Sequence, residues 1–93
     1  RGLRVLDLSG NAEGNKWAEA VANSRHLAGL VELNLKDCGI TDAGALALAE
    51  SPHLNELVRL DVRDQGAAPR PLGAAARRAL VGRFGAGVAY NDG

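Results

Sequence analysis

The chain has 93 residues, which is enough for one domain with a modest core. Aromatic residues make up only 3% of it, so we expect a thin core of aliphatic side chains. Eleven basic residues balance eleven acidic ones, which argues against nucleic acid or a membrane surface as the partner. The single cysteine excludes an internal disulfide, and no apolar run approaches the roughly 20 residues that span a bilayer. We therefore predict a cytoplasmic protein.

In chain order, the first predicted element is a strand in RVLDLS, residues 4–9, where apolar and polar residues alternate. VELNLK, residues 31–36, predicts a second strand of the same kind. A helix is predicted in TDAGALALAE, residues 41–50, because Thr41 and Asp42 favour a helix start and apolar residues follow at helical spacing. Proline at position 52 disfavours helical geometry at Ser51, so the helix should end there.

A pattern of the form L-x-x-L-x-L-x-x-N recurs at a constant step along the chain, from Leu6 to Leu33 to Leu60. Val88 and Tyr90 fall where a fourth pair would stand after a slip of one residue. One strand and one helix cannot bury their own apolar sides, so successive copies should stack with parallel strands. The three full copies are Leu3, Leu6, Leu8 and Asn11; Leu30, Leu33, Leu35 and Cys38; and Leu57, Leu60, Val62 and Gln65.

The segments LRVLDLSGN, LVELNLKDCGITDAGALALAESPHL and LVRLDVRDQ resemble leucine-rich repeats of the helix-bearing, ribonuclease-inhibitor-like bacterial type. RRALVGRFGAGVAY is similar to the last helix and terminal strand of such arrays. The resemblance implies an α/β fold, a right-handed βα solenoid forming a horseshoe segment, with a parallel concave sheet and convex helices. We expect one domain over residues 1–93, with repeats at about 1–27, 28–54 and 55–82 and a capping strand at 83–93.

Two departures from the repeat put local loop geometry in question. Glu13 and Trp17 stand where the second copy has Ile40 and Gly44. Residues 65–71, QGAAPRP, insert one or two residues before the third helix.

The resemblance implies a scaffold that binds a protein partner through the concave strand face. Residues between the inward leucines should point outward there. We expect Glu32 to pair with Arg59, and Asp61 to offset the charges of Lys36 and Arg63. The alternative is an architectural segment of a larger protein, with a self-neutralised face and no ligand of its own. The predicted partner-binding residues are Val5, Asp7, Ser9, Glu32, Asn34, Lys36, Arg59, Asp61 and Arg63.

Asn11, Cys38 and Gln65 occupy the structural ladder position, where a side chain turns inward to satisfy the bend after each strand. Cys38 is therefore expected to be buried and inert rather than a nucleophile. His26 and His53 recur at the same step, and we expect them to donate to helix C-terminal carbonyls or to cover the loop. No third ligand recurs beside them, so no metal, cofactor or catalytic residue is predicted.

Two features leave alternatives open. Trp17 is expected to lie over the end of the array, the alternative being an exposed anchor for a partner. Arg70, Arg77, Arg78 and Arg83 form a basic cluster that is either a solvated cap or a surface for an acidic partner.

The edge of the first strand is the third open feature. Arg1 stands two residues before Leu3, and the chain contains no methionine. We therefore expect further repeats upstream, with self-association through the uncapped edge when the chain is alone.

Overall fold

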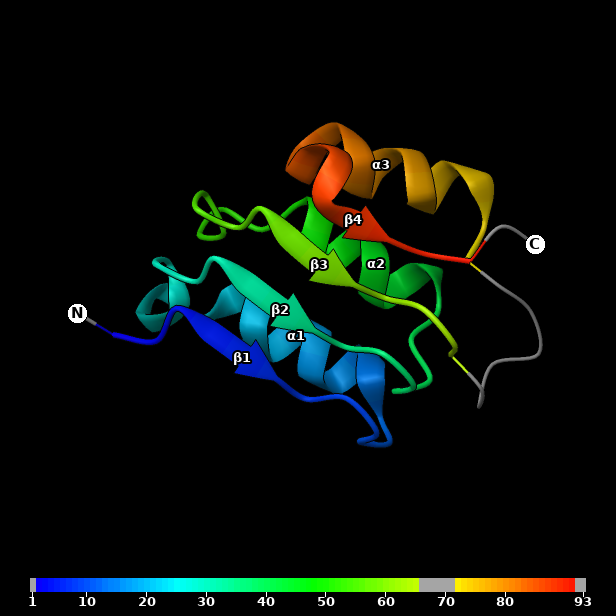
Figure 1. The fold of residues 1–93 in the computed structure, drawn as a ribbon, viewed down its shortest axis with the longest axis horizontal. Helices are drawn as coiled ribbons and strands as arrows, with labels where there is room; N and C mark the ends of the chain where they lie inside the picture. Colours follow the sequence, from blue (N-terminus) through cyan, green and yellow to red (C-terminus); the bar gives the residue numbers. More distant parts are fainter. Residues whose placement is uncertain (1, 66–71, 92–93) are drawn as a thin grey trace.

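The computed structural model describes residues 2–65 and 72–91. Within these ranges it is an α/β fold with one sheet of four parallel strands that stand side by side in chain order (Figure 1). The three α-helices of the same ranges lie behind this sheet, and each strand-to-strand connection passes through one of them. The prediction of parallel strands layered on helices is confirmed. The strands are β1 (Val5–Asp7), β2 (Glu32–Asn34), β3 (Arg59–Asp61) and β4 (Val88–Ala89); the helices are α1 (Gly14–Asn23), α2 (Asp42–Ala49) and α3 (Ala74–Phe84), with short 3-10 turns η1 (Arg25–Leu27) and η2 (Gly85–Gly87).

The strand register follows the sequence repeat. Leu6 pairs with Leu33 and Leu33 with Leu60, so the register keeps the constant step of the repeat. Leu60 then pairs with Val88, which places the predicted slip of one residue between β3 and β4. Parallel strands in this register bring equivalent side chains together in columns across the sheet.

The core lies between the sheet and the helices. In the inner strands the leucine positions are buried, including Leu33, Leu35 and Leu60. The helices face them with small or aliphatic side chains, so the two layers come close together with no aromatic side chain in the buried core of the first two repeats. These helix residues are Ala18, Val21 and Ala22 of α1, Ala45 and Leu48 of α2, and Ala76, Leu80 and Phe84 of α3.

Helix α2 begins and ends where the sequence predicts, but Thr41 acts differently from a capping residue. Its hydroxyl caps no backbone N–H of α2; it accepts a hydrogen bond from Asn15 Nδ2 at 2.8 Å. The backbone N–H of Thr41 in turn donates to Asn15 Oδ1 at 3.0 Å. Thr41 therefore ties α2 to α1. The helix ends at Ala49, shortly before Ser51 and Pro52.

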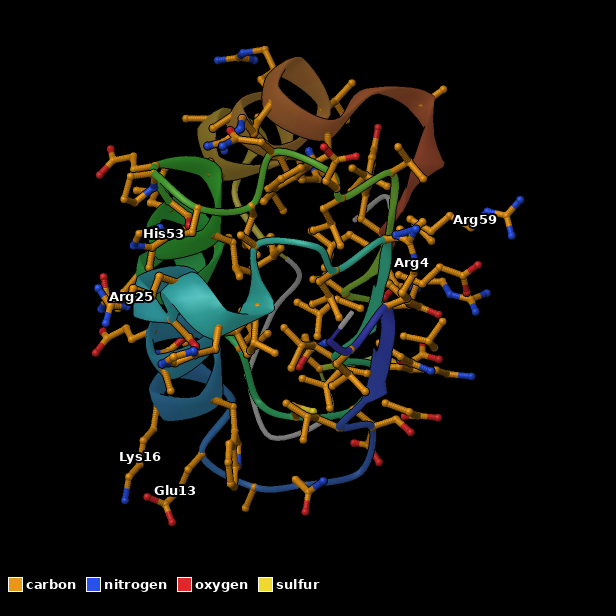
Figure 2. The ribbon with its side chains drawn as sticks, turned by 90° about the vertical axis from the view of Figure 1, so that its left-hand side faces the viewer. Arg4, Glu13, Lys16, Arg25, His53 and Arg59 are labelled. Atoms are coloured by element: carbon orange, nitrogen blue, oxygen red, sulfur yellow. The ribbon has the colours of Figure 1, made fainter. Side chains whose placement is uncertain are left out.

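The helix ends are joined by donors that were not predicted. The Ser51 hydroxyl is buried and donates to the carbonyl of Ala22 at 2.6 Å, and Arg83 Nη1 donates to the carbonyl of Ala49 at 2.9 Å. Ala22 and Ala49 are equivalent positions near the ends of α1 and α2. The histidines were predicted either to donate to these carbonyls or to cover the loop. Neither imidazole makes a hydrogen bond within residues 2–65 and 72–91, so the first alternative is wrong. His53 lies on the helix side of the molecule (Figure 2).

Candidate functional site

The candidate site is the strand face, which we define as the side of the four-stranded sheet turned away from the helices. Figure 2 shows Arg59 projecting outward from this side, opposite to His53 and Arg25. The nine predicted residues fall into three columns that run across the strands, as the register requires. These are Val5, Glu32 and Arg59; Asp7, Asn34 and Asp61; and Ser9, Lys36 and Arg63.

The first column joins an ion pair to an exposed apolar side chain. Arg59 Nη1 lies 3.3 Å from Glu32 Oε2, so the expected cross-strand pair forms. Val5 stands next to Glu32 in the register and is 56% exposed. An exposed β-branched residue beside an ion pair offers a partner both an apolar and a polar contact.

The side chains of the middle column have a structural role that was not predicted from the sequence. Asp7, Asn34 and Asp61 each accept a hydrogen bond from the backbone N–H two residues later, at 2.9, 2.9 and 3.0 Å. Each side chain thereby forms an Asx turn that ends its strand. The recurrence of Asp or Asn at the same step as the leucines was the available signal for this role.

Hydrogen bonds also shift the acidity of two carboxyls in this column. The pKa of Asp7 is lowered, chiefly because the Ser9 hydroxyl donates to its carboxylate at 2.6 Å. The pKa of Asp61 is lowered, chiefly by the hydrogen bonds from the Arg63 guanidinium. The same bonds raise the pKa of Arg63. Both carboxylates are therefore held in their charged form.

The third column carries positive charge, and one of its ion pairs was not predicted. Arg63 pairs with Asp61, with Nη2 to Oδ2 at 2.8 Å. Lys36 was expected to be offset by Asp61 as well, and its charge does contribute to the lowered pKa of Asp61. The ion pair of Lys36 is with Asp64, at 3.7 Å. Asp64 lies in the turn after β3 and has a positive φ of 54°, a conformation that aspartate tolerates better than most residues.

A hollow of about 470 Å³ lies over the strand face. It is lined by residues of all four strands, including Val5, Asp7 and Arg59. At one end it is bounded by Ala86, Gly87 and Ala89, which the sequence analysis did not assign to the site. Gly87 is required there because a Cβ would collide with the carbonyl of Val58. Small residues at β4 thus leave the hollow open beside β3.

The ladder residues bind the bends of neighbouring repeats together. Gln65 Oε1 accepts hydrogen bonds from the backbone N–H of Cys38 at 2.9 Å and of Ile40 at 2.8 Å, while its Nε2 donates to Leu35 O at 2.8 Å. Cys38 Sγ lies 3.1 Å from Leu8 O in the preceding repeat. Among the residues that the structure describes, the Asn11 side chain bonds only within its own repeat, where Nδ2 donates to Leu8 O at 2.8 Å.

The thiol of Cys38 and the potential metal ligands were the candidates for chemistry in the sequence. Cys38 is free and buried, and its thiol faces backbone carbonyls. Over residues 2–65 and 72–91, His, Cys, Asp and Glu side chains form no group of three or more that could hold a metal ion. The helices in the same ranges include none with the length and hydropathy needed to cross a membrane.

A protein-family model described as Leucine Rich repeat matches residues 29–49. The matched segment contains β2 and the whole of α2, the central strand–helix unit of the array. Searches of curated proteins and of solved structures find no match to the chain. The match supports a leucine-rich repeat protein, and repeats of this class generally mediate protein–protein interaction.

Proposed function

We propose that the chain is a protein-interaction module that binds a partner protein through the strand face. The observation that carries this proposal is the open hollow over all four strands, which joins exposed Val5 to charged groups and to the small residues of β4. The scarcity of aromatic side chains on this face favours moderate affinity over tight binding.

The bonding pattern separates residues free to contact a partner from residues needed for the fold. Asn34 and Asp61 end strands through their Asx turns, so changing them would disturb the sheet. Val5 and Arg59 are exposed and make no such turn. The residues that contribute most to the affinity for a partner should therefore lie in the first column.

The alternative is an architectural segment with no ligand of its own, and one observation favours it. Three ion pairs, Glu32–Arg59, Asp61–Arg63 and Lys36–Asp64, use most of the charge on and beside the strand face internally. A face neutralised in this way is well solvated and needs no partner. Under either function the chain is not an enzyme, as the buried thiol and the structural duties of the carboxylates suggest.

The finer assignments belong to the same proposal. We infer a ribonuclease-inhibitor-like bacterial type, with repeats at about 1–27, 28–54 and 55–82 and a terminal strand at 83–93. The general preference for right-handed crossovers favours a right-handed coil. The free thiol of Cys38 is compatible with a cytoplasmic setting.

The test places a photo-crosslinking amino acid at Val5 and, as the matched control, at exposed Glu19 of α1. Irradiation in cells of the source organism should link one defined protein at Val5 and not at Glu19, and Arg59→Gln should weaken that link. Equal linking at both positions, or no link at Val5, would favour the architectural alternative.

A further inference from the structure

A second hollow, of about 460 Å³, lies on the outer face of α3 and is separate from the strand face. We call it the α3 groove. The helix residues that line it stand at positions 74, 77, 78, 81 and 82, which is the spacing of one helix face. Tyr90, just after β4, forms the remaining wall. The opposite side of α3 buries Ala76, Leu80 and Phe84 in the core, so the groove lies on the side of α3 away from the core.

The members of the predicted arginine cluster lie in different places, and only some of them line this groove. Arg83 points toward α2, where it donates to Ala49 O and to Asn55 Oδ1, so it is part of the fold. Arg77 and Arg78 line the groove. Arg70 lies outside the described residues. Of the part of the cluster that the structure describes, two guanidinium groups thus remain on the outer face of the last helix.

Arg77 and Tyr90 hold each other in place. The guanidinium carbon of Arg77 lies 5.6 Å from the centroid of the Tyr90 ring, a cation–π distance. Arg77 Nη1 also donates to Asn91 O at 3.2 Å. Two contacts fix the arginine before any ligand arrives, which lowers the entropy lost on binding.

The groove combines positive charge with exposed apolar surface. Val81 is 37% exposed and Tyr90 36% exposed, and both lie in the lining. On the strand face Arg59, Arg63 and Lys36 each have a carboxylate within 4.0 Å, whereas the described residues that line the α3 groove include no acidic one. Gly82 leaves the floor open, because a Cβ there would meet no atom within 4 Å.

We propose that the α3 groove binds an acidic, aliphatic segment of a partner protein. A carboxylate side chain of the segment accepts hydrogen bonds from Arg78 and Arg77, since guanidinium groups match carboxylates in geometry and charge. An aliphatic neighbour in the segment packs on Val81, Gly82 and the ring of Tyr90. The hollow is larger than a lone carboxylate, and its apolar part favours a peptide over a free anion. The module would then hold partners on two separate surfaces.

The test uses fluorescence anisotropy with the full 93-residue chain and a labelled peptide of alternating Glu and Leu. Arg78→Gln should weaken binding about tenfold, the effect of losing one charge-assisted hydrogen bond. Gly82→Leu should abolish binding by filling the groove. The matched controls are Arg25→Gln, which removes the same charge at an exposed site on η1, and Gly82→Ala, which adds helix propensity with little volume. A peptide of alternating Lys and Leu should not bind.

Amide shifts in nuclear magnetic resonance spectra of the same titration should cluster in α3 and at Tyr90. Four outcomes would overturn the proposal: no binding of the Glu–Leu peptide at millimolar concentration, equal weakening by Arg25→Gln, shifts confined to the strand face, or sedimentation showing a dimer that Gly82→Leu abolishes. Arg78→Gln still decides the question if Gly82→Leu fails to fold by circular dichroism.

Discussion

Leu3 and Leu30 occupy the same place in successive copies of the repeat, yet Leu3 is 45% exposed and Leu30 is 0% exposed. The ladder position shows the same contrast, since Asn11 is exposed while Cys38 is buried. The cause is the number of neighbours: among the described strands, β2 is bonded on both sides and β1 is bonded only to β2. How deeply a motif residue is buried in this fold therefore depends on whether repeats stack on both sides of it. Its position in the motif alone does not decide this.

The helices of the first and second repeats also differ in sequence at a position where their packing against a neighbouring helix differs. Gly44 lies against Asn15 of α1, and a Cβ at Gly44 would collide with that side chain. The equivalent residue in repeat one is Trp17, which is 41% exposed on α1. Trp17 was expected to lie over the end of the array, and its exposure agrees with that expectation only in part. A tryptophan could not replace Gly44 without separating α1 from α2.

The largest expected effect is a difference in stability between alanine variants of Leu30 and Leu3. Leu30→Ala should lower the free energy of unfolding by about 2–5 kcal/mol, because it leaves a cavity in the core. Leu3→Ala should cost less than about 1 kcal/mol, because much of the side chain is in water already. Urea denaturation measures both, and Leu30→Val provides a milder variant if Leu30→Ala does not fold.

Equal losses for the two variants would contradict the comparison. They would mean that Leu3 is covered in solution, as the expected association through β1 requires. Repeating the measurement over a range of chain concentrations then tests that explanation, since a covering second copy makes stability depend on concentration.

The next effect separates the ladder residues. Gln65→Ala removes the acceptor for the N–H groups of Cys38 and Ile40, so stability should fall by about 1–3 kcal/mol. Asn11→Ala removes one bond to Leu8 O at an exposed turn and should cost about 0.5–1 kcal/mol. Hydrogen exchange at the Cys38 and Ile40 amides should accelerate in the first variant only. Unchanged exchange in Gln65→Ala would show that another group accepts these hydrogen bonds.

The parts of this structure that follow a period were predictable from the sequence. The constant step of the repeat predicts the register of Leu6, Leu33 and Leu60, and alternation predicts which side chains face outward. The strand-face columns follow from these two facts alone.

The remaining features depend on single side-chain conformations across repeats. Ser51 donates to Ala22 O, Arg83 donates to Ala49 O, and Lys36 forms its ion pair with Asp64. The serines that follow the first two helices, Ser24 and Ser51, were visible as a recurrence. The hydrogen-bond partner of Ser51 was not, because its distance to a carbonyl of another repeat depends on how closely the helices pack. Gly87 was not predicted as a site residue for the same reason, because its close approach to the Val58 backbone also depends on packing between repeats.

The smallest expected effect concerns Asp61 in the inner β3 and Asp7 in the edge strand β1. Because the folded-state pKa of Asp61 is lowered from its ordinary value of 3.8, its stabilising effect is present above that pH and is lost as the pH falls through the folded value. The pKa of Asp7 is lowered too, so its effect has the same sign. Asp61→Asn should keep the turn, because Asn34 makes the same bond to a backbone N–H. Wild type should therefore exceed Asp61→Asn in stability at pH 7, and the difference should shrink as the pH falls below 3.8 and through the lowered folded-state pKa of Asp61.

Salt then distinguishes the causes of the two shifts. The partner of Asp61 is the Arg63 cation, whereas the partner of Asp7 is the neutral Ser9 hydroxyl. In about 1 M salt, where the screening length is about 3 Å, the difference between wild type and Asp61→Asn at pH 7 should shrink, and the difference for Asp7→Asn should change less. Thermal unfolding at four combinations of pH and salt measures both. Equal salt sensitivity at the two positions would show that the Asp61–Arg63 bond acts as a neutral hydrogen bond does, and that the inner strand gains nothing from pairing charges on its outward face.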